Sequence, residues 1–287
     1  MRIWSLLILL LSFGCWVAPG MAGQETPSSP AGGMEPVKQE IAERWNKSAP
    51  TYDSRPEHGV SSQAETQAWQ ELFSSILPGQ GLKVLDVGCG TGEMSFIWAG
   101  LGQEVFGVDI SEGMLAKARE KAAALTDEAL RARLHFQFGD AEALPFPTDS
   151  FDAVFARHVL WTLPQPQKAI DDWRRVLKPG GKVIVIDALW DDGSFSTRLR
   201  RQLAGWLRYL VEGQKPGTTH YSAQVEAALP HRRGVPLEAA KAYFDRAGLK
   251  DLQEQQLTRI ADIQKSDMPL WYRLGFKNDY YVLWGQK

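Results

Sequence analysis

The 287-residue sequence predicts an α/β protein built on a doubly wound, mostly parallel sheet. Short apolar runs rich in Val, Ile and Phe alternate with polar stretches of helical length. This alternation is typical of strands joined by crossover helices. The first apolar run leads into a glycine-rich turn and then into a helical pattern, which is how such sheets begin a nucleotide site. We therefore expect helices on both faces of the sheet.

The first strand is expected over 84–87, and the helix that follows it over 93–99. Between them, Gly88, Gly90 and Gly92 stand at alternate positions. Glycine adopts positive φ without strain and lets a ligand lie against the bare main chain. The turn therefore predicts a ligand site at the start of this helix.

The charges beside the turn indicate which nucleotide it binds. The G-x-G-x-G spacing differs from the G-x-G-x-x-G of dinucleotide sites, and no P-loop lysine follows Gly92. Asp86 and Glu93 flank the turn, and two carboxylates there would repel a diphosphate. A neutral or cationic adenosine derivative is favoured. S-adenosylmethionine, with its sulfonium and ammonium charges, fits best.

The second strand, expected over 104–109, ends in a carboxylate. Asp109 follows the first glycine by about 20 residues, the position from which an acid accepts hydrogen bonds from both ribose hydroxyls. Ser111 is a plausible N-cap for a helix over 112–123. The alternative for Asp109 is a solvated strand end.

The third strand, expected over 135–138, is followed by two residues suited to adenine. Asp140 is placed to accept a hydrogen bond from the adenine amino group, and the Ala141 N–H to bond to a ring nitrogen. The remaining elements are expected as a strand over 151–156, a helix at about 167–177, the turn Lys178–Gly181, a strand over 182–187, a helix at about 236–247, and strands at about 251–258 and 279–287.

Four blocks of sequence carry a family resemblance: VLDVGCGTGE (84–93), VFGVDIS (105–111), GDAEALPFPTDSFD (139–152) and RVLKPGGKVIVID (175–187). In this order and with these gaps, the chain resembles class I S-adenosylmethionine-dependent methyltransferases. The resemblance is to their small-molecule branch, which includes the ubiquinone and menaquinone C-methyltransferases, and it covers about 37–287. It implies a seven-stranded Rossmann-like sheet whose last strand is antiparallel. The residues that it implies for cofactor binding are Asp86, Gly88, Cys89, Gly90, Asp109, Ile110, Asp140, Ala141 and Tyr52.

Residues for the methyl acceptor are expected directly after the fourth strand. His158 has the intrinsic pKa of a base near neutrality, although a role as a pocket-lining residue is an equal alternative. Arg157 is placed to bind an acidic group of the acceptor, and Trp161 to contact its apolar part. The segment 45–53 matches the family's N-terminal helix and loop, so Tyr52 is a candidate catalytic lid residue beside the sulfonium.

A helical cap is expected as an insertion at about 190–235. Within it, the segment 194–212 has apolar residues at helical spacing with arginines alongside. We expect this apolar stripe to pack on the domain. The alternative is a basic amphipathic surface for a membrane or a lipid-like acceptor.

The first residues of the chain differ in character from the rest. Residues 1–22 resemble a secretory signal, with one Arg before a short apolar run, and 23–36 form a Ser/Pro/Gly-rich linker. The methyltransferase domain is expected over 37–287. A signal conflicts with a cofactor that is made in the cytoplasm, so translation from Met34 is one alternative, and a tethered or exported enzyme is another. A cytoplasmic working site is favoured.

Composition narrows the partners. The formal net charge of −2 argues against a long nucleic acid partner. Neither the two cysteines nor the histidines show metal-ligand spacing, and the acids Asp187, Asp191 and Asp192 are only a weak magnesium signal, so no metal is expected. Eleven tryptophans favour an apolar or aromatic acceptor pocket. Oligomeric state is open.

The predicted function is methyl transfer from S-adenosylmethionine to a small molecule by in-line displacement. One alternative is a quinone-type or lipid-like C-methyltransferase at a membrane. Another, from a different class, is a non-catalytic regulatory or interaction protein that binds S-adenosylmethionine.

Overall fold

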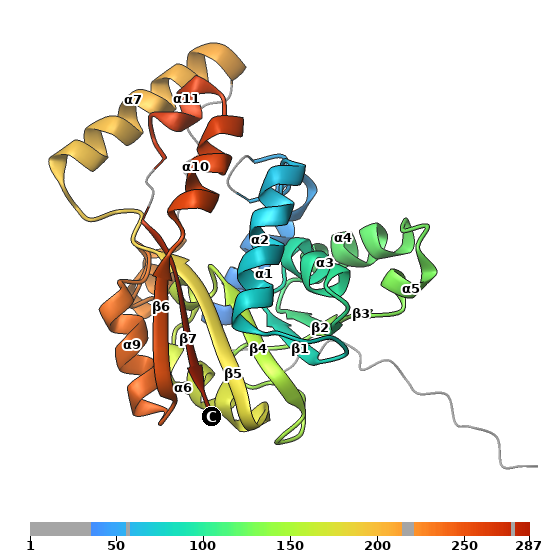
Figure 1. Cartoon of the computed structure of the whole chain (residues 1–287). Helices are drawn as coiled ribbons and strands as arrows, with labels where there is room; N and C mark the ends of the chain where they lie inside the picture. Colours follow the sequence, from blue (N-terminus) through green and yellow to red (C-terminus); the bar gives the residue numbers. More distant parts are fainter. Residues whose placement is uncertain (1–35, 56–57, 214–220, 277–278) are drawn as a thin grey trace, which may run out of the picture. The chain divides into compact units, whose positions relative to one another are not determined.

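A seven-stranded sheet with the order β3-β2-β1-β4-β5-β7-β6 organises the computed structural model (Figure 1). The structure describes residues 36–55, 58–213, 221–276 and 279–287, all within the unit Met34–Lys287. The signal-like segment 1–22 and nearly all of the predicted linker 23–36 lie outside the described residues.

The sheet confirms the predicted fold class. Strands β1 to β5 pair in parallel, whereas β7 is antiparallel to both of its neighbours, β5 and β6. The strands are β1 (Lys83–Val87), β2 (Glu104–Asp109), β3 (Leu134–Phe138), β4 (Phe151–Arg157), β5 (Leu177–Ala188), β6 (Lys250–Gln256) and β7 (Tyr280–Gln286).

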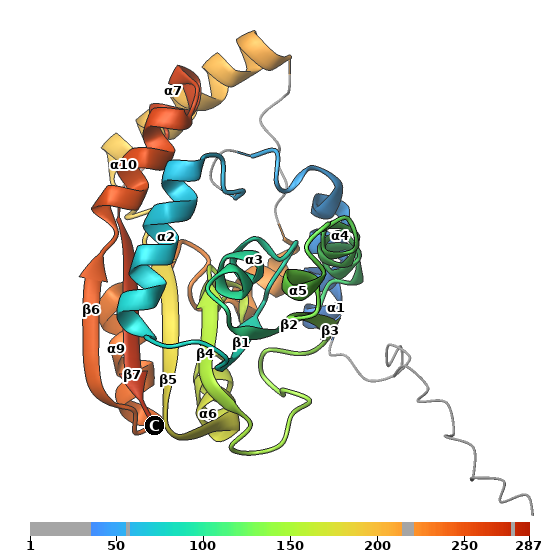
Figure 2. The same cartoon turned by 45° about the vertical axis from the view of Figure 1, so that its right-hand side comes forward.

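Helices cover both faces of the sheet (Figures 1 and 2). Phe73, Trp98 and Ile260 of α2, α3 and α10 pack on one face, and Trp173 and Phe244 of α6 and α9 on the other. The helices are α1 (Pro36–Ser48), α2 (Gln63–Ile76), α3 (Glu93–Gly100), α4 (Glu112–Ala123), α5 (Glu128–Arg131), α6 (Pro166–Val176), α7 (Phe195–Glu212), α8 (Ala223–Ala228), α9 (Leu237–Arg246), α10 (Thr258–Asp267) and α11 (Leu270–Arg273), with 3₁₀ turns at Ala49–Thr51 and Leu160–Thr162.

The turn predicted at Lys178–Gly181 lies inside β5, so that prediction is wrong in its boundaries. Phe151 pairs with Leu177, but Ala153 pairs with Lys182, so the extra residues of β5 form an irregularity in the ladder. Such an insertion disrupts the pairing locally without ending the strand.

A buried carboxylate fastens α2 to α10. The Glu65 side chain accepts hydrogen bonds from Trp69 Nε1 on its own helix, at 3.1 Å, and from Gln264 Nε2 on α10, at 2.7 Å. Ser62 caps α2 through its side chain. This clamp fixes α10, from which the chain continues into α11 and the wall of a cavity described below.

The predicted packing of α7 is wrong. The helix forms where expected, capped by Ser194, but its large apolar side chains are exposed, with Phe195 at 79%, Trp206 at 65% and Leu210 at 73%. Figures 1 and 2 show α7 beyond the end of the sheet, beside α11 and α10. Among the described helices, α7 included, there is none with both the length and the apolar character needed to cross a bilayer.

Candidate active site

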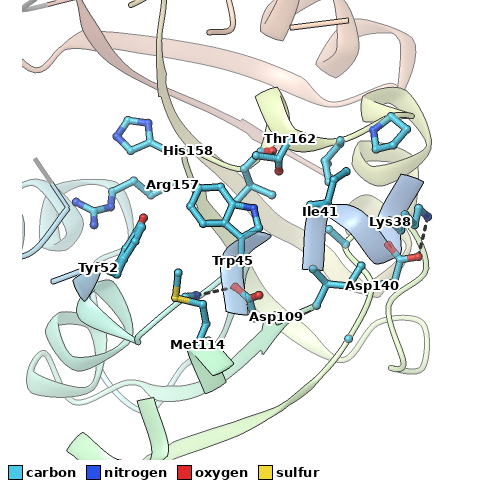
Figure 3. A pocket seen from close by; sticks show the side chains of 18 residues that line it. Lys38, Ile41, Trp45, Tyr52, Asp109, Met114, Asp140, Arg157, His158 and Thr162 are labelled. Carbon is cyan, nitrogen blue, oxygen red and sulfur yellow. Dashed lines mark hydrogen bonds and ion pairs between the residues drawn. The ribbon is translucent and has the colours of Figure 1, made fainter. Parts of the chain in front are cut away.

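Two adjoining cavities lie at the carboxyl ends of the parallel strands. The first is a cleft between α1 and the ends of β1, β2 and β3 (Figure 3). The second, of about 410 Å³, lies beneath α7 and α11. Trp45, Tyr52 and His158 line both cavities, so the two spaces meet at these three side chains.

The glycine turn forms the floor of the cleft. Gly88, Gly90 and Gly92 have φ of 64°, 55° and 85°, a region that other residues adopt only with strain. A Cβ on Gly88 would also come within 2.5 Å of a methyl of Val159. Glycine is therefore required at the first position both by conformation and by space.

Cys89 is not among the residues that line the cleft. Its N–H bonds to the Val108 carbonyl, and its sulfur faces Gly107, where an added Cβ would come within 2.9 Å of Sγ. Burial raises the pKa of the thiol. Cys89 thus shapes the turn through its backbone.

Asp109 joins the turn to β2 and faces the cleft. Its Oδ2 accepts the N–H of Gly90 at 2.8 Å, and its Oδ1 accepts the N–H of Ser111 at 2.8 Å. Burial raises the pKa of Asp109 to about 6 although these N–H groups favour its charged form. The N–H of Ile110 also bonds to this carboxylate. A carboxylate has about four acceptor sites, so Asp109 keeps capacity for a ligand hydroxyl, and Ile110 lines the cleft beside it.

Asp86 and Glu93 flank the turn as the sequence indicated, but neither is among the residues that line the cleft. Asp86 is 2% exposed and accepts Ser95 Oγ at 2.6 Å, and burial raises its pKa to about 7. Glu93 forms an ion pair with Lys121 at 2.5 Å and accepts the N–H of Val60. The acid beside the turn that lines the cleft is Asp109 at the end of β2.

Lys38 of α1 is a cleft residue that the sequence did not reveal. Its Nζ lies 2.7 Å from Asp140 Oδ2 and 2.6 Å from Glu142 Oε2. Burial alone would lower the pKa of Lys38, but these two carboxylates raise it overall. Ala141 lines the cleft between them, and its carbonyl accepts the indole N–H of Trp173. The ion pairs hold α1 against the end of β3.

Helix α1 narrows the cleft. Figure 3 shows Trp45 and Ile41 of α1 in the cleft, with Asp109 and Met114 close to Trp45. The cavity is only about 90 Å³, whereas small-molecule sites usually span roughly 300–1,000 Å³. The side chains of α1 therefore occupy part of this cleft.

His158 stands at the junction of the cavities in a strained conformation. Its φ is 58°, and its N–H bonds to the Ile186 carbonyl at 2.9 Å. Its Nδ1 lies 3.9 Å from Asp187 Oδ1 at the end of β5. Within the described residues, neither His158 Nδ1 nor Asp187 Oδ2 has a hydrogen-bond partner. Backbone strain of this kind persists where the surrounding structure enforces it, and it is frequent at active sites.

Burial shifts the two groups in opposite directions. Burial, and then the charge of Arg157, lowers the pKa of His158 to about 3. Burial raises the pKa of Asp187 to about 8. Both shifts favour the uncharged forms, so near neutral pH the carboxyl proton stays on Asp187 and the His158 imidazole is neutral.

The other predicted acceptor residues are divided between the cavities. Tyr52 stacks on His58 at 4.3 Å, and burial raises its pKa. Arg157 lines the cleft and donates to the His58 carbonyl at 2.7 Å, whereas Trp161 lines the second cavity. The second cavity has Arg201 and Arg208 of α7 instead, which the sequence did not assign to a site. No group of His, Cys, Asp or Glu in the described part of the chain is arranged to hold a metal ion.

Replacing Lys38 tests the attachment of α1. Lys38→Met leaves two carboxylates without their cation, and Glu142 is fully buried, so we expect a loss of about 3 kcal/mol in the free energy of unfolding. Urea denaturation at pH 7 measures it. Lys47→Met, at an exposed position of the same helix, should change stability by less than about 0.5 kcal/mol. Equal stability of the two variants would contradict the role given to Lys38.

Replacing Asp86 tests its raised pKa. An acid whose pKa rises from 3.8 to about 7 on folding destabilises the folded state increasingly as pH rises through that window. Asp86→Asn should therefore match the wild type near pH 4 and exceed it by up to about 4 kcal/mol above pH 7. Urea unfolding at several pH values measures the difference, with Asp245→Asn as an exposed control. A difference independent of pH would refute the assignment.

Comparison with known proteins shows which proteins this chain resembles. A methyltransferase domain model matches residues 85–185. The chain is 37% identical over 151 residues to a demethylmenaquinone methyltransferase of Renibacterium salmoninarum, covering 52% of this chain and 58% of the relative. It is 37% identical over 148 residues to a malonyl-[acyl-carrier protein] O-methyltransferase of Erwinia pyrifoliae, a match that covers 51% of this chain and 50% of the relative. The chain thus spans about half the length of these relatives.

Solved structures share the fold at low sequence identity. The phosphoethanolamine N-methyltransferase 2 of Haemonchus contortus in complex with S-adenosyl-L-methionine has a TM-score of 0.59 at 18% identity, over 89% of this chain and 60% of that one. The [4+2]-cyclase SpnF has a TM-score of 0.57 at 20% identity, and the match covers 89% of this chain and 97% of that one. Residues 85–185 thus match a methyltransferase domain, the chain is similar in sequence to demethylmenaquinone methyltransferases, and its fold is shared with a solved S-adenosyl-L-methionine complex.

Proposed function

We propose that this protein transfers a methyl group from S-adenosylmethionine, bound in the cleft, to a small molecule bound in the second cavity. The observation that carries the proposal is the junction of the two spaces at Trp45, Tyr52 and His158. A donor and an acceptor that meet at one point react as if in a single molecule, which lowers a barrier by roughly 7–11 kcal/mol when they are well aligned.

The cleft offers groups that suit each part of the cofactor. The backbone of Gly88 and Gly90 lies open to the methionine part, and beyond its chain neighbours a Cβ on Gly90 would meet only Tyr52, at 4.0 Å. Asp109, supported by Ile110, is proposed to accept the ribose hydroxyls. The adenine is proposed to lie against Asp140 and Ala141 below α1. Asp86 and Cys89 support the turn without lining the cleft.

When bound, S-adenosylmethionine supplies a methyl group already activated by the sulfonium. The protein's contribution is then alignment and the exclusion of water. Trp45 and Tyr52 lie edge to face, with ring centres 6.0 Å apart, at the junction. Aromatic faces attract a cation, so these two rings are proposed to hold the sulfonium against the acceptor.

His158 is proposed as the base that receives a proton from the acceptor. Its ring is neutral and borders both cavities. Once Asp187 is ionised, its charge 3.9 Å away favours the protonated imidazole, so the histidine becomes a stronger base as Asp187 loses its proton. A positioned base typically contributes 10²–10⁴-fold to such a step.

The acceptor class is proposed to be a small molecule, as the demethylmenaquinone in the name of one relative is; another relative is named for a malonyl group on an acyl-carrier protein. We place the reaction in the cytoplasm, where S-adenosylmethionine is made. The [4+2]-cyclase among the structural neighbours has a similar fold but bears a different activity in its name. For that reason a binding experiment must be joined to a transfer experiment.

Calorimetry with S-adenosylhomocysteine tests the cofactor site. Asp109→Ala removes the ribose acceptor and releases the Gly90 N–H, so we expect binding to weaken at least tenfold. Glu112→Ala, which removes a nearby carboxylate outside the cleft, should bind as the wild type does. The site assignment fails if the wild type binds neither S-adenosylmethionine nor its product, or if both variants bind equally well. Transfer of a labelled methyl group into a metabolite extract then identifies the acceptor.

Nuclear magnetic resonance tests the proton-holding pair without any acceptor. We expect one carboxyl to titrate near pH 8 and to vanish from the spectrum in Asp187→Asn. The His158 ring should remain neutral down to pH about 3 and should report the ionisation of Asp187 by a shift change near pH 8. Arg157, His231 and Tyr281 also act on the pair and should be checked by their own signals. A His158 ring that titrates near pH 6.5, or that ignores the loss of Asp187, would refute the coupling.

A further inference from the structure

The walls of the second cavity are aromatic. Trp161 and Trp190 meet edge to face at 5.3 Å, Trp45 adjoins Trp161 at 6.0 Å, and Tyr280 adjoins His158 at 5.2 Å. All five line the cavity. Aromatic side chains bind a flat ring in offset-stacked or edge-to-face geometry, so these walls suit a planar ligand better than a flexible chain. The volume of about 410 Å³ holds a fused pair of rings.

The charged side chains that line the second cavity are all basic. Among its described lining residues there is no Asp or Glu, while Arg201 and Arg208 of α7 both contribute. Arg201 lies 3.5 Å from Asp191. Arg208 is half-buried above the ring of Tyr272, at 5.5 Å, and within the described residues it has no carboxylate at ion-pair distance. A half-buried guanidinium without an acid offers a planar fork of donors that matches a carboxylate.

Arg208 lines only the second cavity, whereas Trp45, Tyr52 and His158 form the junction with the cleft. An anion bound to Arg208 would therefore occupy the second cavity and not the cleft.

We propose that the second cavity binds a planar aromatic acceptor that carries a carboxylate, with the ring against Trp161 and Trp190 and the carboxylate on Arg208. The proposal rests on the proposed function, because it takes this cavity as the acceptor site. It goes further in naming the chemical class of the acceptor and the residue that selects it.

The test uses the full chain saturated with S-adenosylhomocysteine and two probes that differ by one group. Calorimetry is expected to show that 6-hydroxy-2-naphthoate binds at least about tenfold tighter than 2-naphthol, since a charge-assisted hydrogen bond is gained. Decahydro-2-naphthoate, which keeps the acid but has no aromatic face, should bind more weakly than the aromatic acid. Equal affinity for the acid and for 2-naphthol, or no binding of the acid, would overturn the proposal.

Two variants in α7 test whether Arg208 is the residue that selects for the carboxylate. Arg208→Gln should abolish the preference for the acid while the affinity for 2-naphthol stays the same. Arg198→Gln, whose guanidinium bonds to the Gly193 carbonyl outside the cavity, should keep the preference. A preference retained in Arg208→Gln would overturn the assignment to that residue. Two further measurements separate the proposed function from this inference: the heat of S-adenosylhomocysteine binding, and titrations of the naphthalene probes in the absence of S-adenosylhomocysteine. Loss of cofactor binding defeats the proposed function, whereas cofactor binding without acid selection defeats only this inference.

Discussion

The hydrogen bond from the Gly90 N–H to the Asp109 carboxylate is the contact on which the site depends. Parallel pairing puts Val87 beside Val108, so the turn after β1 and the end of β2 are neighbours before any side chain is considered. The Asp109 carboxylate then fixes the turn at 2.8 Å with its face to the cleft. Positive φ at the glycines permits the tight path. One carboxylate therefore both shapes the turn and faces the cleft.

Three buried acids at the carboxyl edge of the sheet share one electrostatic situation. Asp86, Asp109 and Asp187 end or nearly end β1, β2 and β5, and burial raises the pKa of each. Such groups disfavour folding at neutral pH, because the charged form is more stable in water. Shifted acids gathered at one edge, beside cavities, are characteristic of functional sites rather than of structural cores. The core on either face of the sheet is mainly apolar, so it stabilises the fold without the free-energy penalty of burying these acids.

The sequence predicted what is local and missed what joins distant segments. Strand ends, the glycine turn and the Ser111 cap follow from patterns of a few residues, and the side chain of Ser111 does accept the Met114 N–H. Lys38 lies 102 residues from Asp140, and nothing near it in the chain signals an ion pair. Glu93 lies 28 residues from its ion-pair partner Lys121, and no local pattern signals that pairing either. Burial and pairing of charges are decided by tertiary contacts, which local patterns do not contain.

Helix α7 shows why the largest apolar stripe need not be the buried one. From hydropathy, the face with Phe195 and Trp206 is expected to be buried against the domain, yet those side chains are exposed. The inward face carries Ala204 and Gly205, which line the second cavity, and a Cβ on Gly275 would lie 3.1 Å from the Ala204 Cβ. Small residues allow α7 to approach α11 closely while the space below them stays open. Large apolar side chains at these two positions would occupy the cavity, which Arg201 and Arg208 of the same helix also line, so the helix can cover this space only because its bulky apolar residues point away from it.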